Sequence, residues 1–131
     1  MASYERIPDE VERVGRAIVD AALRVHKSLG PGLLESVYEV CLQYELEKAG
    51  FAVRRQVPLP IVYDGLVLDA ELRLDLVVND CVLVEVKAVE GLLPVHDAQV
   101  LTYLKLGGYR LGFLINFNVG LLENGIHRRI L

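Results

Sequence analysis

The sequence has few cysteines, and they do not form a metal-binding or disulfide pattern. Cys41 and Cys81 stand far apart among apolar neighbours and form no Cys-x-x-Cys motif. Structural zinc sites and disulfide-rich scaffolds need several cysteines at short, regular spacings. We therefore expect both side chains to pack as small apolar groups and exclude cysteine chemistry from the function.

Long apolar runs are also missing. No window approaches the roughly 18 apolar residues that a membrane span requires, and residues 1–9 lack the apolar segment of a secretory signal. Low-complexity and Ser/Pro-rich segments are likewise absent from the 131 residues. The sequence therefore predicts a cytoplasmic protein with no membrane partner. We expect one domain over residues 1–131, with residues 1–8 as a loose N-terminal segment.

An excess of positive charge is the third feature that the chain lacks. It carries 14 Lys and Arg against 18 Asp and Glu, a formal net charge of -4. Proteins that coat nucleic acid depend on many Lys and Arg contacts to phosphate. The composition therefore excludes a nucleic-acid coat protein, and any contact with nucleic acid is expected to be local.

The first half of the chain contains two helical patterns. Apolar residues recur at three- and four-residue steps from Val11 to Leu29, which predicts a helix over about 9–29. A stop-and-turn signal follows at residues 30–32, after which the same period resumes at Leu34 and ends before Gly50. Two helices are therefore expected to lead the chain.

From Phe51 onward the pattern becomes β-rich. Short apolar runs are separated by prolines and by turn pairs at residues 64–65 and 79–80, which predicts an antiparallel meander over residues 51–87. A third helix is expected over residues 95–106, and a strand buried on both faces over 110–117. Asn124-Gly125 indicates a closing hairpin. This order predicts an α/β sandwich in which helices flank a mixed central sheet.

Three residues with catalytic potential stand on the predicted strands. Glu85 and Lys87 are two residues apart in VLVEVKAV, so both side chains point to the same face of a strand. Asp75 lies one strand earlier, across the turn at residues 79–80. Two carboxylates suit a hard cation such as Mg²⁺, and a nearby lysine can orient a water and stabilise charge on a phosphate. The same spacing also arises by chance on exposed strands, where charged and apolar residues alternate.

The hairpin between the two acids imposes a geometric condition. A loop of two or four residues would place Asp75 opposite Val84 and turn its side chain away from the face of Glu85. A loop of three or five residues, or one β-bulge, would return both carboxylates to one face. We therefore predict such an irregularity between Asp75 and Glu85. Carboxylates on opposite faces of a regular ladder would rule out a shared metal ion.

Further candidates lie on the helices. Glu35 falls in the first turn of the second helix with Tyr38 one turn on, and either supplies a third carboxylate or complements the helix dipole. On the third helix His96, Gln99 and Tyr103 are spaced by three and four residues and form one hydrogen-bonding stripe. This stripe either lines a substrate groove or consists of a capping histidine and an amphipathic tyrosine.

Four segments taken together resemble the GxxExxY protein family of the PD-(D/E)XK nuclease-like superfamily. The segments are LGPGLLESVYE, LRLDLVV, LVEVKAV and PVHDAQVLTYLKLGGYRLGFLINF, and they cover nearly the whole chain. Gly32, Glu35 and Tyr38 supply the motif that names the family. Leu74 stands before Asp75, where the superfamily name has a proline.

The resemblance implies a restriction-endonuclease-like core and a nuclease site. It implies that Asp75, Glu85 and Glu35 bind Mg²⁺ or Mn²⁺ and that Lys87 is the fourth catalytic residue. Gln99 and Tyr103 are similar to the Q-x-x-x-Y element of the recombination-exonuclease branch. They are expected to position the substrate, together with Tyr38 and His96.

Two functions from different classes remain open on the sequence. The first is a Mg²⁺- or Mn²⁺-dependent nuclease that hydrolyses phosphodiester bonds in DNA or RNA, with no other cofactor. The second is a non-catalytic interaction or accessory domain that keeps the nuclease fold. Small size, acidic charge and a hydrophobic fraction of 53% motivate the second reading, because they suit a homodimer surface.

Overall fold

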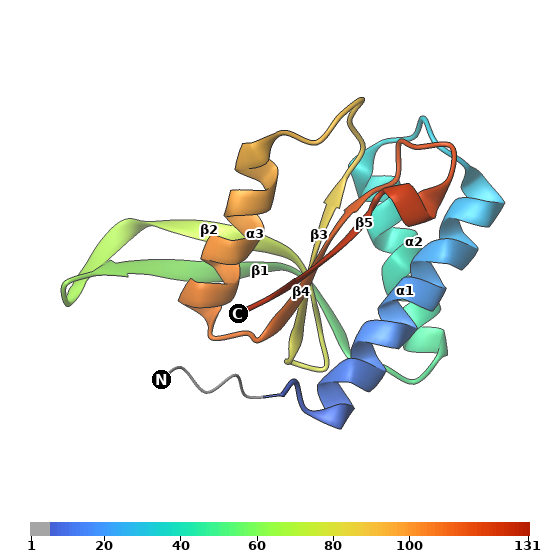
Figure 1. The fold of residues 1–131 in the computed structure, drawn as a ribbon. Coiled ribbons are helices and arrows are strands. Elements are labelled where there is room, and N and C mark those ends of the chain that lie inside the picture. Colours follow the sequence, from blue (N-terminus) through green and yellow to red (C-terminus); the bar gives the residue numbers. More distant parts are fainter. Residues whose placement is uncertain (1–5) are drawn as a thin grey trace.

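The computed structural model describes residues 6–131, which form three α-helices and a five-stranded sheet (Figure 1). In chain order the elements are α1 (Asp9–Leu29), α2 (Glu35–Lys48), β1 (Val53–Tyr63), β2 (Leu66–Val78), β3 (Val82–Lys87), α3 (Pro94–Gly107), β4 (Leu111–Asn116), the short 3-10 helix η1 (Leu122–Asn124) and β5 (Ile126–Ile130). The predicted fold class, a mixed sheet flanked by helices, is confirmed.

The helices form where the apolar period predicted them. α1 begins with three acidic residues in its first turn, which complement the helix dipole. Its buried positions follow one stripe, Val14, Gly15, Ile18, Ala21, Ala22 and Val25. Of the expected loose segment, residues 1–5 lie outside the described part of the chain, while Ile7 is buried at 6% exposure. No helix within residues 6–131 is long and apolar enough to cross a membrane.

The sheet has the strand order β1-β2-β3-β4-β5. β1, β2 and β3 form the predicted antiparallel meander. β3 and β4 are parallel and are joined through α3, and all six residues of β4 are buried. β5 pairs antiparallel with β4. The predicted closing hairpin is therefore present, and its connection runs through η1, with Asn124 as the last residue of η1 and Gly125 directly before β5.

Two hydrophobic cores lie on opposite faces of the sheet. α1 and α2 pack on one face, over Val82, Val84 and Val86 of β3. α3 lies on the other face of the sheet from α1 and α2 (Figure 1). Its buried Val100 and Leu104 belong to a smaller core there. A Cβ at Gly112 would lie 2.9 Å from a Leu104 methyl carbon, so glycine there lets α3 approach β4 closely.

The β1–β2 hairpin extends beyond the rest of the sheet (Figure 1). The sequence predicted several short runs here, whereas β1 is one strand of 11 residues that passes through Pro58 and Pro60. β1 is an edge strand, and proline is tolerated at an edge because only one side of the strand needs ladder hydrogen bonds. Only the base of the hairpin, through Val57 and Leu59, packs against the α3-side core.

Candidate functional site

The candidate site begins at the turn between β2 and β3. Val78 pairs with Val82, so the loop consists of the three residues Asn79, Asp80 and Cys81. Asn79 and Asp80 have φ angles of 49° and 54°, a left-handed conformation that Asn and Asp adopt more readily than most residues. The predicted irregularity is therefore present as an odd loop. Continued by one pair, this register brings Asp75 across from Glu85, as an odd loop requires.

The two strands part at these carboxylates. The β2–β3 ladder ends with the pair Leu76–Val84, and side chains replace backbone partners beyond it. The Asp75 backbone N–H donates to Glu85 Oε1 at 3.1 Å. The Val86 backbone N–H donates to Asp75 Oδ2 at 2.8 Å. The opening between β2 and β3 is thus lined by two carboxylates that hold each other's strand in place.

Burial raises the pKa of both acids. Burial raises the pKa of Glu85 to about 8, and the neighbouring charge of Asp75 adds to this shift. Burial likewise raises the pKa of Asp75, against the lowering effect of the Val86 N–H and the Lys87 ammonium. A proton or another cation between the two groups would relieve their repulsion. The pKa values of both acids are therefore perturbed, as those of ionisable groups at functional sites often are.

Lys87 and Tyr103 lie close enough to take part in this electrostatic environment. The positive charge of Lys87 lowers the pKa of both acids, and Lys87 follows Glu85 on the same face of β3. Tyr103 packs beside the α3-side core, and burial together with the charges of Glu85 and Asp75 raises its pKa. Gln99 is partly buried and lies one helical turn before Tyr103 on α3. Strand β3 and helix α3 thus present their polar groups to one region.

Glu35 approaches from the opposite helical layer. It is the first residue of α2, and its charge contributes to raising the pKa of Asp75. A hollow of about 460 Å³ adjoins it and is lined by Leu33, Leu34, Glu35, Ser36, Ala88 and Val89. The hollow lies just beyond Lys87, at the carboxyl end of β3. Glu35 therefore lies beside the Asp75–Glu85 pair without a direct hydrogen bond to it among those described.

Two predicted positioning residues have structural partners. Tyr38 is fully buried, donates its hydroxyl to Gly30 O at 2.6 Å and accepts from the Leu33 N–H at 3.1 Å. It also stacks on Phe117, with ring centroids 4.5 Å apart. Tyr38 therefore fixes the loop before α2 and can reach the site only through that loop, which carries Glu35.

His96 caps α3. Its Nδ1 accepts from the Leu93 N–H at 3.0 Å, and the His96 N–H donates to Leu93 O at 2.9 Å. These bonds satisfy groups at the helix N-terminus and match the capping alternative that the sequence left open. The other ring nitrogen, Nε2, is the atom through which His96 could contact a substrate.

Asn116 is a site-supporting residue that the sequence reasoning missed. It is 3% exposed and bonds both backbone groups of Val89, its Oδ1 accepting at 3.1 Å and its Nδ2 donating at 2.9 Å. The Phe117 N–H also donates to Lys87 O at 2.9 Å. These bonds fix the segment that follows Lys87. A lone amide inside the apolar run LGFLINF was the available signal.

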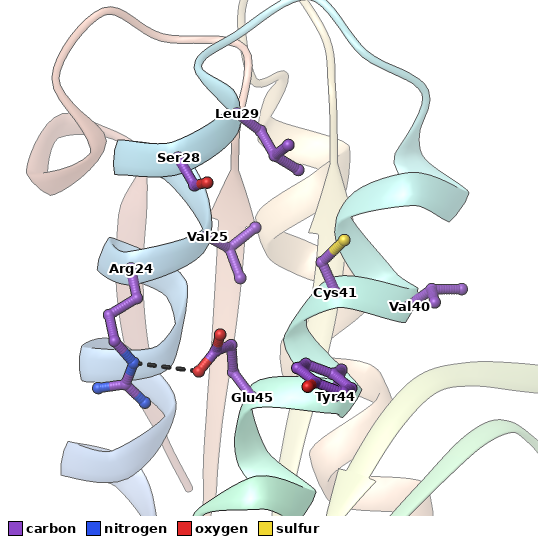
Figure 2. Close-up of a pocket in the computed structure, with 8 residues that line it drawn as sticks. All are labelled: Arg24, Val25, Ser28, Leu29, Val40, Cys41, Tyr44 and Glu45. Atoms are coloured by element: carbon purple, nitrogen blue, oxygen red, sulfur yellow. Dashed lines mark hydrogen bonds and ion pairs between the residues drawn. The ribbon is translucent and has the colours of Figure 1, made fainter.

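A different hollow lies between α1 and α2, away from these acids. It has a volume of about 330 Å³ and a mostly apolar wall. Figure 2 shows the side chains that line it. On its rim Arg24 Nε lies 3.2 Å from Glu45 Oε2. Its lining residues are Arg24, Val25, Ser28, Leu29, Val40, Cys41, Tyr44 and Glu45. None of them belongs to the candidate site, so this hollow is separate from the Asp75–Glu85 pair.

The donor set suits a magnesium-like ion held in part by water or substrate. Within residues 6–131, no three His, Cys, Asp or Glu side chains converge closely enough to form a complete metal site. Asp75 and Glu85 nevertheless converge, and Mg²⁺ is commonly held by one or two carboxylates while waters and phosphate oxygens fill the remaining positions. Two carboxylates with raised pKa values therefore fit a divalent cation.

Of the comparisons with known proteins, the one with protein families gives a match. No curated protein and no solved structure gives a significant match to the chain. The family described as the PD-(D/E)XK nuclease superfamily matches residues 12–129, from the first turn of α1 to the penultimate residue of β5. Nucleases of this superfamily generally use divalent metal ions. The α/β fold, the paired strand acids and the match over nearly its whole length together place this chain in the PD-(D/E)XK nuclease superfamily.

Proposed function

We propose that this protein is a Mg²⁺- or Mn²⁺-dependent phosphodiesterase that hydrolyses nucleic acid. The observation that carries the proposal is the pair Asp75 and Glu85, which meet where β2 and β3 part and have Lys87 on the same face. Superfamily membership supports nucleic acid as the substrate class. DNA and RNA both remain candidates.

In this proposal each residue has one role. Asp75 and Glu85 hold the metal ion, with Glu35 contributing charge or a water-mediated contact from α2. Lys87 orients the attacking water and stabilises negative charge on the phosphate. Tyr103, which burial keeps protonated at neutral pH, donates toward the same region with Gln99 beside it. A bound divalent cation would stabilise the charge that develops on the phosphate oxygens.

The chemistry balances without a further co-reactant. A water oxygen bonds to phosphorus and gives up a proton to solvent, one ester P–O bond breaks, and the leaving oxygen takes up a proton from solvent. Glu85 must first lose its proton to act as a ligand, since metal-binding carboxylates are deprotonated. We therefore expect metal affinity to increase as the pH approaches about 8, the value to which burial raises the pKa of Glu85.

The test combines metal binding with cleavage. Calorimetric titration with Mn²⁺ should show saturable binding that Asp75→Asn and Glu85→Gln abolish. Labelled single- and double-stranded DNA and RNA should be cut in the presence of Mg²⁺ or Mn²⁺. Lys87→Ala should reduce the cleavage rate by roughly a thousandfold, as removal of a transition-state donor does.

The control is Glu45→Gln, which changes a helix carboxylate paired with Arg24 and Lys48 on the far side of α2. It should leave binding and cleavage unchanged. Folding of each variant is checked by circular dichroism. Absence of saturable Mn²⁺ binding in the unmodified protein would refute the proposal and favour the non-catalytic reading.

A further inference from the structure

Strand β1 contains a backbone irregularity directly beside the candidate site. Gln56 has a φ of 52°, a left-handed conformation that is unfavourable for a residue with a Cβ and uncommon in a strand. The register places it across from Asp75, and ladder pairing skips these two residues. The flanking pairs are Arg55–Leu76 and Val57–Leu74. Backbone strain of this kind persists only where the surroundings hold it.

At this point the side chains of the β1–β2 hairpin exchange the two faces of the sheet. In a regular strand, residues two apart share a face. Val53 packs in the α1–α2 core, whereas Val57 and Leu59 pack in the α3-side core. On β2, likewise, Leu76 packs on the α1–α2 side and Leu74 on the α3 side. Both strands therefore change faces together, and the change falls at Gln56 and Asp75.

A buried glutamate holds Gln56 in place. Glu39, on α2 one turn after Glu35, is 4% exposed. Its Oε1 accepts from Gln56 Nε2 at 2.8 Å and from Arg55 Nε at 3.2 Å. On the other side of the strand, Arg73 Nη1 donates to Gln56 O at 3.3 Å. Side chain and carbonyl of the strained residue are thus both fixed.

We propose that Glu39 and Gln56 form a positioning clamp, which sets the turnover of the β1–β2 hairpin and thereby aims the Asp75 carboxylate at Glu85 and Val86. Neither residue touches the reacting atoms in this proposal. The clamp acts through the backbone, because the orientation of Asp75 depends on where β2 changes faces. Outer partners of this kind commonly orient the groups that hold a metal ion.

The Val86 amide allows the clamp to be tested without measuring catalytic activity. Its N–H donates to Asp75 Oδ2 at 2.8 Å, so its hydrogen-exchange protection and proton chemical shift follow the position of that carboxylate. In Glu39→Ala we expect Val86 protection to fall at least about tenfold, the equivalent of one lost hydrogen bond. Glu39→Gln keeps an acceptor for Gln56 and should restore protection to within about threefold of the unmodified protein.

Two variants of Gln56 separate backbone strain from side-chain contact. Gln56→Gly loses the bond to Glu39 but adopts a positive φ freely, whereas Gln56→Ala loses the bond and retains the strain. We expect Val86 protection to fall further in Gln56→Ala than in Gln56→Gly. These variants also decide the proposal if Glu39→Ala does not fold. Glu45→Ala, on the same helix with Arg24 as its partner, is the matched control and should leave the Val86 amide unchanged.

Two outcomes would overturn the clamp. One is a Val86 amide that is unaffected in Glu39→Ala and Gln56→Ala. The other is a uniform loss of protection that includes Phe113, which pairs with Val84 in the β3–β4 ladder, because this would indicate a general packing role. A Mn²⁺ titration of the same variants, which rests on the proposed function, should show affinity reduced by roughly tenfold. If the unmodified protein binds no Mn²⁺, that function fails while the amide measurements still decide the clamp.

Discussion

The two faces of the central sheet each bury a glutamate, and they surround it differently. On the α1–α2 face, Glu39 is 4% exposed and accepts hydrogen bonds from Arg55 and Gln56. On the α3 face, Glu85 is 6% exposed and meets a second carboxylate, Asp75. Burying a charge is costly unless donors or an opposite charge compensate it.

The difference in surroundings distinguishes Glu39, which supports the fold, from Glu85, which belongs to the candidate site. The donors around Glu39 tie α2 to strand β1. Glu85 lies in an environment that raises its pKa to about 8 through burial and the charge of Asp75. An arrangement that resists ionisation in this way costs folding stability and is typical of a site that takes up a cation. The following predictions test whether the two faces differ as described.

The largest loss of stability is expected from the α1–α2 face. Leu42 is fully buried in the core between α2 and the sheet. Leu42→Ala should lower the free energy of unfolding by roughly 2–5 kcal/mol, because it removes apolar contacts and leaves a cavity. Urea unfolding measures this loss. A loss below about 1 kcal/mol would show that this face contributes less to the fold than its burial indicates.

The two glutamates should respond differently to neutral substitution. Because folding raises the pKa of Glu85 from 4.5 to about 8, its stabilising contribution is complete below pH 4.5 and is lost as the pH rises through about 8. Glu85→Gln does not titrate, so it should raise the free energy of unfolding by roughly 2 kcal/mol at pH 8 and leave it nearly unchanged at pH 4.5. Chemical denaturation at both pH values measures the difference.

Glu39→Gln is the matched comparison for that measurement. Glu39 is surrounded by donors, so its substitution should give no gain at pH 8. An equal gain in both variants would contradict the distinction between the two faces.

The smallest effect on stability is expected at Tyr103, at the edge of the α3-side core. Tyr103→Phe keeps the ring and should change the free energy of unfolding by less than about 0.5 kcal/mol. If the proposed function holds, the same variant should lower the cleavage rate by about tenfold through the loss of one hydrogen bond. Paired denaturation and cleavage assays measure both quantities. A large loss of stability would instead assign the hydroxyl a structural role.

Much of the fold could be predicted from local patterns of apolar residues in the sequence. The helical period gave α1 at its observed bounds, and an apolar run predicted the fully buried β4. The requirement that Asp75 and Glu85 share a face, combined with the side-chain period of two, predicted an odd loop or a bulge between them, and the loop has three residues. Each of these inferences depends on residues near one another in the sequence, which is why sequence reasoning could reach them.

The clamp could not be predicted in this way. A positive φ at a glutamine has no local signal, and here it depends on Glu39, which lies 17 residues earlier in the chain. Pro58 and Pro60 also interrupt the strand pattern, so the turnover of the hairpin was hidden. Asn124-Gly125 indicated the closing hairpin correctly, but the 3-10 helix η1 in its connection had no signal in the sequence that we identified.

The three-residue turn Asn79–Cys81 also limits how this chain can diverge among relatives. Surface loops usually tolerate insertions and deletions, because they make few packing contacts. Here, adding or removing one residue would rotate every side chain of one strand to the opposite face and separate Asp75 from Glu85. Relatives that keep the site are therefore free to vary the residues of this turn, but a change in its length must come in steps of two or be balanced by a bulge.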